Sequence, residues 1–274
     1  MDLTQELSLE DLLLRSEKRK KVIFLLMEGP KNIGDIANVL AAPPTSILPQ
    51  IKKLKDSHLV LQKGKYYSLS CIGKIMAEKM VPLLGTLQVL EKNYDYWTDR
   101  ALEGIPAFLL RRLGELGDYR VIEPDLGRIF EPHAEFKENL LNSREVLHFS
   151  SYFQPSLIPV YSEYLKINRK VVFVISNIFF ERMLADYSEV YETFLDSDNS
   201  SLFVYPQAPR ILSFTVTERF MSMLLFDKKG KLDQKFLISF EESAIEWGKE
   251  LFAYYLNLSE EVSGARVLAD ESGP

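Results

Sequence analysis

The spacing of apolar residues predicts three helices at the amino end of the chain. The first covers residues 10–27 and ends at Gly29-Pro30, because glycine followed by proline stops a helix. In residues 33–40 apolar side chains recur at i, i+3, i+4 and i+7, and the preceding Asn32 is a suitable N-cap. The third helix is expected over Thr45–Asp56. Its apolar stripe consists of Ile47, Ile51 and Leu54.

Pro49 restricts where the third helix can start. Proline has no N–H and breaks a helix interior, but the N–H groups of a first turn have no intrahelical acceptor anyway. We therefore expect the helix to begin at Thr45 or Ser46, with one of these hydroxyls as its N-cap. The face opposite the apolar stripe consists of Thr45, Ser46, Pro49, Lys52, Lys53 and Asp56.

Residues 58–62 and 66–69 are short β-prone runs on either side of a glycine. They predict a β-hairpin with Lys63 and Lys65 at its tip, followed by a helix from Ile72. Helix, helix, turn, helix and hairpin is the order of a winged helix-turn-helix. In that fold the third helix enters the major groove of DNA, and the hairpin tip lies on the backbone or minor groove.

The residue types on these two elements suit a nucleic acid. Small polar side chains at a helix start can reach base edges or a phosphate, and lysines attract phosphates whatever the base sequence. The expected DNA contacts are Thr45, Ser46, Pro49, Gln50, Lys52, Lys53, Lys63 and Lys65. Arg15, Lys18 and Lys20 either add phosphate contacts or form an ordinary solvated helix face. Because the exposed face of the third helix has no arginine, we expect modest or shape-dependent base specificity.

Strands alternate with helices in the rest of the chain, which predicts an α/β body with a mixed sheet and an overall fold class of α+β or α/β. Lys170–Ile175 is an apolar, β-branched run, as expected for a central strand covered on both faces. Strands are expected at 119–122, 146–150, 170–175, 201–205, 211–216, 220–226 and up to 239. Helices are expected at 94–116, 133–141, 155–165, 179–184, 188–195 and 243–256. The expected organisation is a winged helix-turn-helix domain over 1–72, a helical linker over 73–116, an α/β sensor domain over 117–258 and a disordered tail over 259–274.

Small polar residues follow two neighbouring predicted strands. Ligands of α/β sheets bind at the carboxyl ends of parallel strands. Glu218 and Arg219, which lie between two later predicted strands, could face the same cleft. The candidate ligand-binding residues are Ser150, Ser151, Tyr152, Ser176, Asn177, Glu218 and Arg219. Together they would orient a small polar metabolite. The alternative is that they are ordinary turn and cap residues at strand ends.

The net charge of −6 is divided unevenly along the 274 residues. Residues 1–80 hold 13 Lys/Arg and 9 Asp/Glu, a net of +4, and residues 81–274 hold 20 and 30, a net of −10. A basic head on an acidic body indicates that the head meets a polyanion, unless the difference is a chance fluctuation.

Other features exclude several classes of protein. Cys71 is the only cysteine, so a disulfide framework and a cysteine zinc finger are excluded, and we expect it to be a buried packing residue. His148 is expected to be a core or pocket histidine, and the three scattered histidines predict no metal centre.

No nucleophile elbow, phosphate-binding loop or dinucleotide motif occurs, so we expect no enzyme and no cofactor. No apolar run approaches the ~18 residues of a membrane span, and the acidic N-terminus is unlike a signal peptide, so we expect a cytoplasmic protein.

The expected linker helix is mostly apolar. Its apolar residues are Ile75, Met76, Val81, Leu83, Leu84, Leu87 and Leu90. They either pair with a second copy in a homodimer or pack against the body of the same chain. A dimer would place two recognition helices about one DNA turn, ~34 Å, apart on a palindromic site.

Several segments resemble archaeal winged-helix transcriptional regulators that carry a C-terminal sensor domain of the methanogenesis-regulator type. The segments that carry the resemblance are 15–21, 25–30, 46–54 and 67–74 in the head, and 149–152, 171–176, 204–206 and 214–219 in the body. The resemblance implies a cytoplasmic, dimeric archaeal transcription factor and names no ligand. Related archaeal sensor domains are similar to phospholipase-like folds, whose histidine–lysine catalytic motif is absent from this chain.

Two functions follow from these patterns. The preferred one is a ligand-responsive transcription factor whose partners are double-stranded DNA and a small-molecule effector. The alternative is a protein-interaction module or an enzyme that uses the winged helix as a docking surface. The alternative predicts no DNA affinity and no steep salt dependence, and the lysines of the head favour the first function.

Overall fold

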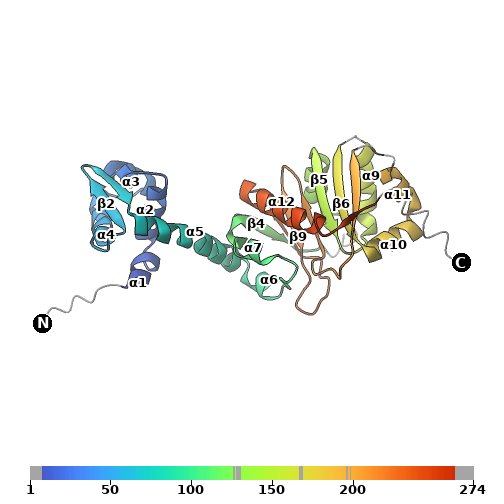
Figure 1. Ribbon diagram of the computed structural model, residues 1–274, viewed down its shortest axis with the longest axis horizontal. Coiled ribbons are helices and arrows are strands. Elements are labelled where there is room, and N and C mark those ends of the chain that lie inside the picture. Colours follow the sequence, from blue (N-terminus) through green and yellow to red (C-terminus); the bar gives the residue numbers. More distant parts are fainter. Residues whose placement is uncertain are drawn as a thin grey trace. The chain divides into compact units, whose positions relative to one another are not determined.

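The protein is described from a computed structural model, which covers residues 8–125, 127, 131–166, 169–195, 197 and 199–262. The chain divides into two compact units between Leu84 and Gly85 (Figure 1). Each unit has its own hydrophobic core.

The first unit is a helical domain with a small antiparallel sheet in the strand order β1-β3-β2. Its elements are α1 (Leu9–Leu14), α2 (Glu17–Met27), β1 (Lys31–Asn32), α3 (Ile33–Leu40), α4 (Pro44–Asp56), β2 (Val60–Lys63), β3 (Tyr66–Leu69) and the first part of α5 (Cys71–Lys92). The expected hairpin is confirmed, and Gly64, with φ +61, occupies the first position of its two-residue turn. The side chains of Ile47, Ile51 and Leu54 are buried, as their spacing predicted.

Two local expectations for this unit are wrong. The helix expected over 10–27 is broken at Ser16, whose hydroxyl accepts from the N–H of Arg19 and starts a new helix. Helix α4 is capped by neither Thr45 nor Ser46, because its N-cap is Pro43 and its first residue is Pro44. A proline suits a first helical position, since its φ is already helical and its missing N–H would have had no partner there. Pro49 then lies in the second turn and leaves the Thr45 carbonyl without its usual donor.

The second unit is built on an eight-stranded mixed sheet in the order β11-β7-β6-β5-β8-β9-β10-β4. Strands β5, β6 and β7 are parallel, and the remaining pairs are antiparallel. The strands are β4 (Tyr119–Ile122), β5 (Glu145–Ser150), β6 (Lys170–Ser176), β7 (Ser200–Tyr205), β8 (Ser213–Val216), β9 (Met221–Leu224), β10 (Phe236–Ser239) and β11 (Glu260–Glu261). The fold class expected from the sequence, with an N-terminal winged helix and a mixed α/β sheet, is confirmed.

Helices cover both faces of this sheet (Figure 1). One face carries α6 (Tyr94–Thr98), α7 (Ala107–Leu110), the 3-10 helix η1 (Leu113–Leu116) and α12 (Glu242–Leu256). The other carries α8 (Ala134–Leu141), the 3-10 helix η2 (Pro155–Leu157), α9 (Ile158–Lys166), α10 (Asn177–Asp186) and α11 (Ser188–Leu195). Strand β6 is covered on both sides, as its apolar run predicted, because Val171 and Val174 belong to different core clusters.

Two expectations for the body are corrected. The single helix expected over 94–116 is three short helices. One reason is that Pro106 precedes the start of a new helix. Another is that the backbone of Gly104 lies so close to Arg210 that a Cβ at residue 104 would be 2.5 Å from the Arg210 carbonyl oxygen. The tail expected to be disordered from residue 259 begins with an ordered strand, β11, which pairs with β7. Residues 263–274 of that expected tail lie outside the described residues.

Candidate functional site

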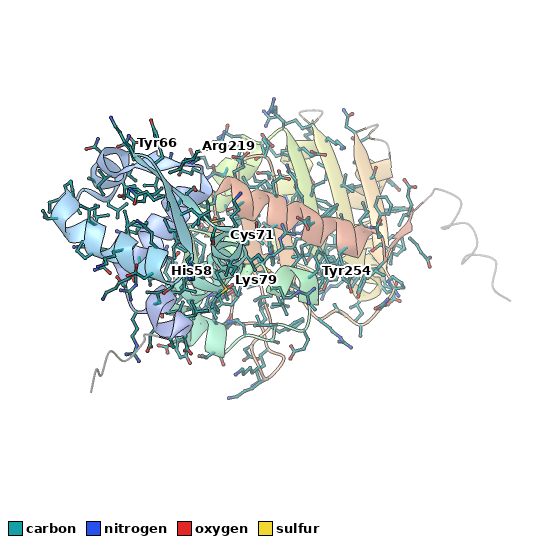
Figure 2. The ribbon with its side chains drawn as sticks, turned by 60° about the vertical axis from the view of Figure 1, so that its left-hand side comes forward. His58, Tyr66, Cys71, Lys79, Arg219 and Tyr254 are labelled. Carbon is teal, nitrogen blue, oxygen red and sulfur yellow. The ribbon has the colours of Figure 1, made fainter. Side chains whose placement is uncertain are left out.

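The predicted DNA-contacting residues form one polar surface on α4 and the hairpin. Thr45, Pro49, Lys52 and Lys53 are exposed on α4, and Ser46 and Gln50 are partly buried. Lys63 and Lys65 are exposed at the β2–β3 turn, where Figure 2 marks the neighbouring Tyr66. We call the eight predicted contact residues on α4 and at this turn the head surface.

The four lysines of the head surface are free of ion pairs with any described residue. The ion pairs found in the first unit use other cations, those of Arg15, Lys20 and Lys31. The nearby Lys55 instead donates to Gln62 at 2.6 Å. The head surface therefore presents uncompensated positive charge, which is what a phosphate backbone attracts.

Gln50 is held by a buried arginine that sequence reasoning did not single out. Arg19 is 6% exposed, and its Nη1 donates to Gln50 Oε1 at 2.9 Å. Its other nitrogens donate to the carbonyls of Leu12 and Asp11 at the end of α1. Arg19 thus joins α1, α2 and α4 and orients the Gln50 amide. The signal was present, because Arg19 precedes buried α2 residues by three, four and seven positions, the spacing of one helix face.

The strand-end residues of the body do come together. Ser176 Oγ donates to the Ser151 carbonyl at 2.9 Å and caps α10 by accepting from Phe179 N–H. Ser150 Oγ donates to the Tyr152 carbonyl at 2.8 Å. These hydroxyls therefore act as cap and turn groups. Next to them Asn177 is exposed, and the buried Ser151 Oγ has no partner among the described residues.

Glu218 and Arg219 do not join this cluster. Strand β8 runs antiparallel to β5 with Ser213 opposite Ser150, so the turn after β8 lies at the start of β5 rather than at its end. Glu218 accepts there from the backbone N–H groups of Arg144 and Glu145, at 2.8 and 3.4 Å. The expectation that this pair faces the same cleft is wrong, because the antiparallel pairing of β8 with β5 puts the turn at the opposite edge of the sheet.

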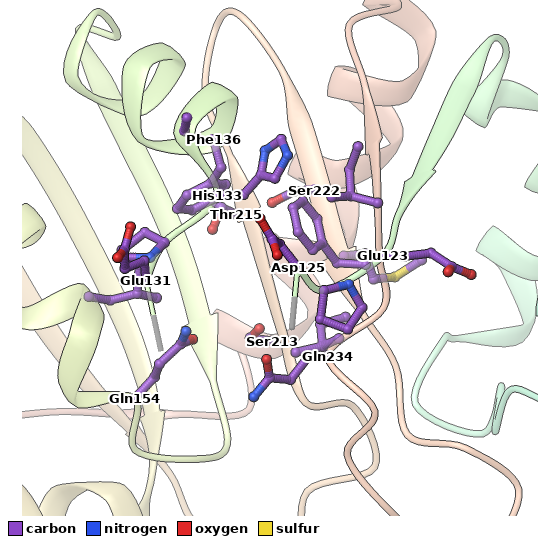
Figure 3. Close-up of a pocket in the computed structure, with 18 of the residues that line it drawn as sticks. Glu123, Asp125, Glu131, His133, Phe136, Gln154, Ser213, Thr215, Ser222 and Gln234 are labelled. Atoms are coloured by element: carbon purple, nitrogen blue, oxygen red, sulfur yellow. The ribbon is translucent and has the colours of Figure 1, made fainter. Parts of the chain in front are cut away.

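The cavity of the body lies beside the predicted cluster, on the face covered by α8 and α9. Its volume is about 340 Å³ (Figure 3). His148, Thr215 and Ser222 are partners across β5, β8 and β9 and form a polar row in its wall. Tyr152 is the one predicted ligand-binding residue that lines it.

A sequence signal for this cavity exists in the alternation of β5, β8 and β9. In these three strands polar side chains alternate along the chain with buried apolar side chains. These polar residues are His148 and Ser150, Ser213 and Thr215, and Ser222. Side chains at alternate positions share a sheet face, so a buried polar row on one face indicates a pocket or a satisfied network.

Burial keeps His148 neutral. The side chain is 5% exposed, and its Nδ1 lies 2.9 Å from Thr215 Oγ1 and 3.1 Å from the Tyr161 hydroxyl oxygen. Desolvation lowers the pKa of His148 to about 3. Both hydroxyls approach Nδ1, so Nε2 is the ring nitrogen that could form a hydrogen bond with a molecule in the cavity.

Acidification is expected to destabilise the fold through His148. The unfolded ring has a pKa of about 6.5 and takes up a proton that the folded protein does not, so stability falls as pH drops below 6.5. Between pH 6.5 and 5.0 this contribution is roughly 1.5 kcal/mol. Urea unfolding of His148→Gln should show a loss smaller by that amount, and equal losses in both proteins would contradict a neutral buried His148.

The described residues contain no group of three metal ligands and no helix that is both long and apolar enough to span a membrane. Cys71 is exposed rather than buried as expected (Figure 2).

A winged helix joined to an α/β body with a partly enclosed polar cavity defines the class of winged-helix regulators. The family model described as "Methanogenesis regulatory protein FilR1, N-terminal domain" matches residues 10–88, and the one for the middle domain of the same protein matches residues 129–258. Together the two models match more than half of the chain. The chain belongs to this family of archaeal transcriptional regulators.

A curated relative is similar over most of the chain. Methanogenesis regulatory protein FilR1 of Methanothrix harundinacea is 27% identical over 256 residues, which are 90% of this chain and 56% of the relative. The chain therefore spans about half the length of the curated relative that it matches.

Two solved structures have weaker similarity. TrmBL2, an archaeal chromatin protein with a novel mode of DNA binding, has a TM-score of 0.42 at 12% identity, over 89% of this chain and 94% of its own. The phospholipase D family member Nuc of Salmonella typhimurium has a TM-score of 0.39 at 10% identity, over 54% of this chain and 100% of its own.

Proposed function

We propose that this protein is a transcriptional regulator that binds double-stranded DNA through the head surface. The observation that carries the proposal is the set of four exposed lysines, unpaired among the described residues, on α4 and on the hairpin tip that follows it. Helix α4 enters the major groove, and the hairpin tip lies along the backbone. Thr45, Ser46, Pro49 and Gln50 face the bases or the nearest phosphate, and the lysines neutralise phosphates.

The distribution of charge supports this arrangement. The head carries a net charge of +4 in its first 80 residues, and the remainder carries −10. An acidic body is repelled by the DNA backbone, so the field of the protein favours approach by the head. Binding to the chromosome also places the protein in the cytoplasm.

The body is proposed to sense a small polar molecule in the cavity. A volume of about 340 Å³ is in the range of metabolite-binding pockets, and polar groups in its wall would orient a ligand. A ligand that binds one arrangement of the two units more tightly than another would change DNA affinity by that difference.

A mobility-shift titration on the DNA upstream of the protein's own gene tests the DNA-binding proposal. We expect a shifted complex whose binding constant falls steeply with salt, because released counterions accompany each neutralised phosphate. A binding constant that does not depend on salt, or no complex at any salt concentration, would refute it.

A homodimer formed through α5 is part of the proposal. Four apolar side chains on one side of this helix are 42 to 55% exposed, with two on either side of the exposed Lys79 along the helix, and exposed apolar surface of this kind favours a protein–protein contact. They are Ile72, Ile75, Leu83 and Leu87. Val81 is also exposed, at 46%, but it lies about two and a half turns from Ile72, on the opposite side of the helix.

We expect Leu83→Glu to convert a dimer into a monomer of 31.6 kDa, because a buried, unpaired carboxylate would face the second copy. Light scattering after gel filtration measures the mass. Val81→Glu is the matched control on the other side of α5 and should remain dimeric. A wild-type mass of 31.6 kDa would rule the dimer out.

A further inference from the structure

The side-chain amide of Gln50 has a fixed orientation in the head. Gln50 is partly exposed on α4, where Ser46 precedes it by one turn and Lys53 follows it by one turn. Its Oε1 accepts from Arg19 Nη1 at 2.9 Å. A guanidinium has N–H donors and no acceptor, so the amide atom that faces Arg19 is the oxygen and never the nitrogen.

Arg19 is held in turn by the backbone at the end of α1. Its Nη2 donates to the Asp11 carbonyl at 3.1 Å, and its Nε donates to the Leu12 carbonyl. The residue is buried, and a planar guanidinium with three nitrogens engaged has little freedom to turn. Arg19 therefore keeps the oxygen of the Gln50 amide directed toward the interior of the head.

The charge of Arg19 polarises the Gln50 amide. No carboxylate of a described residue forms an ion pair with Arg19, and the Asp11 carboxylate pairs with Arg15 at 2.7 Å instead. A hydrogen bond from a buried cation is stronger than one between neutral groups, and hydrogen bonds in a chain strengthen one another. The bond from Arg19 draws electron density toward Oε1, which makes the N–H2 group of the same amide a better donor.

The end of the amide that remains available to DNA is a donor. Gln50 Nε2 donates to no described residue and is not a buried atom. In the major groove adenine presents an acceptor beside a donor, and a glutamine matches it with both Nε2 and Oε1. That pairing is closed to Gln50 because its oxygen faces Arg19. Guanine presents two adjacent acceptors, O6 and N7, which suit a group that only donates.

We propose that Arg19 is a positioning residue that makes Gln50 select guanine over adenine at one base pair of the DNA site. Gln50 Nε2 donates to O6 and N7 of that guanine in the major groove, and Arg19 acts through Gln50 without touching DNA. The inference rests on the proposed function of the head surface and adds the base that this surface reads.

Binding-site selection followed by affinity measurements tests the inference. The full chain selects duplexes from a randomised pool, and the base pair read by residue 50 is the one whose preference disappears in Gln50→Ala. Four duplexes that differ only at this pair are then compared by fluorescence anisotropy. The wild type should bind the guanine duplex about tenfold more tightly than the adenine duplex, which is the order of one good base contact. The proposal is overturned if no base pair depends on residue 50 or if another base is preferred to guanine.

Arg19→Met separates the positioning role from a purely structural one. The substitution removes the donor that holds Oε1, so the amide is free to turn and pair with adenine. The ratio of guanine to adenine affinity should therefore fall to about threefold or less. A purely structural role would weaken binding to all four duplexes by the same factor, and such an unchanged ratio overturns the proposal.

Gln50→Glu tests the same point in a variant that keeps its contact with Arg19, now as an ion pair. The carboxylate has no N–H group and only accepts, so the preference for guanine should be lost, and its retention would overturn the proposal. Gln62→Glu is the matched control. Gln62 is exposed on β2, its Oε1 accepts from Lys55 at 2.6 Å, and its substitution should leave the wild-type ratio of affinities unchanged.

The same measurements separate this inference from the proposed function. If the wild type forms no complex with any duplex, the proposed function is refuted and the inference with it. Salt-dependent complexes that bind the four duplexes with equal affinity support the proposed function and overturn the inference alone.

Discussion

Replacement of Lys52, Lys53, Lys63 and Lys65 by glutamate is expected to abolish DNA binding at physiological salt. Each lysine that neutralises a phosphate contributes roughly 0.9 to the slope of log binding constant against log salt, so losing four contacts lowers the slope by about 3 to 4. The reversed charges also repel the backbone. Fluorescence anisotropy of a labelled duplex over a salt series measures both the affinity and the slope.

Two double variants measure the contributions of α4 and of the hairpin tip separately, and a control variant measures the effect of net charge alone. Lys52→Glu with Lys53→Glu tests α4, and Lys63→Glu with Lys65→Glu tests the hairpin tip; each pair should lower the slope by about 2. Lys228→Glu with Lys229→Glu reverses two adjacent exposed lysines in the body and should leave the slope unchanged. Unchanged affinity of the fourfold variant would show that the head surface does not contact DNA.

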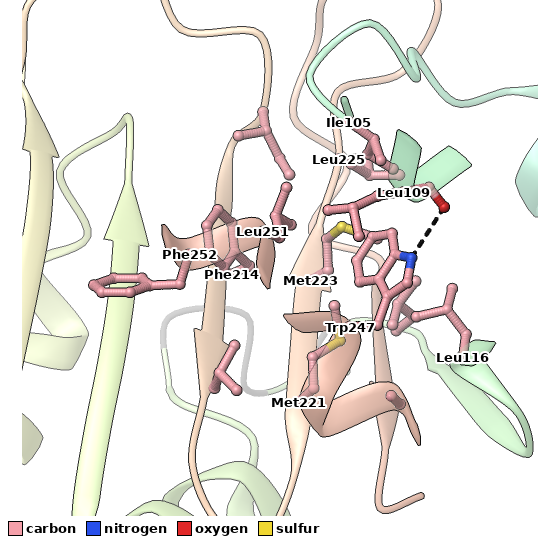
Figure 4. Close-up of a cluster of buried hydrophobic side chains, with 14 of the residues drawn as sticks. Ile105, Leu109, Leu116, Phe214, Met221, Met223, Leu225, Trp247, Leu251 and Phe252 are labelled. Carbon is pink, nitrogen blue, oxygen red and sulfur yellow. Dashed lines mark hydrogen bonds between the residues drawn. The ribbon is translucent and has the colours of Figure 1, made fainter. Parts of the chain in front are cut away.

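Trp247→Ala is expected to destabilise the body by about 3 to 5 kcal/mol. Trp247 is completely buried between α12 and the sheet, and its Nε1 donates to the Leu109 carbonyl at 3.0 Å (Figure 4). Its removal leaves a large cavity, and the Leu109 carbonyl keeps only its hydrogen bond from the Arg112 N–H. Urea unfolding followed by circular dichroism measures the loss.

Two further substitutions separate the contribution of the hydrogen bond from that of the buried ring. Trp247→Phe keeps much of the ring but loses the hydrogen bond, so a smaller loss is expected. Tyr254→Ala removes an aromatic ring from the exposed side of the same helix and should cost under about 1 kcal/mol. A similar cost for Trp247→Ala and Tyr254→Ala would contradict the buried position of Trp247. Because the two units have separate cores, the unfolding of each should be fitted separately.

Elements with strong local signals were predictable. Helix α3 has the expected bounds, because Asn32 forms a capping box with Asp35 and the apolar spacing is regular. Strand β6 was predictable because a continuous apolar, β-branched run is typical of a strand that is covered on both faces. The hairpin followed from a glycine between two β-prone runs.

Local signals of similar strength were misjudged where two of them competed. Apolar spacing continued across Ser16, but a serine side chain that accepts from a backbone N–H starts a new helix there. Thr45 and Ser46 are good N-caps, but Pro44 already provided a preformed first turn. In both cases the deciding interaction lies within three residues along the chain and does not depend on tertiary contacts.

The cavity could not be located from the chain alone. Its wall is a row of His148, Thr215 and Ser222, whose positions in the sequence are 67 and 7 residues apart and which meet only through strand register. Glu218 was misplaced for the same reason, since an antiparallel β8 reverses the end of the sheet at which its turn lies. The amino-acid pattern was sufficient for the winged helix, the α/β body and the exposed lysines of the head, because each depends on spacing along a few consecutive residues. Which polar groups share a cavity and which buried arginine orients Gln50 were decided by the pairing of distant strands and helices. That pairing depends on free energies of packing summed over the whole fold.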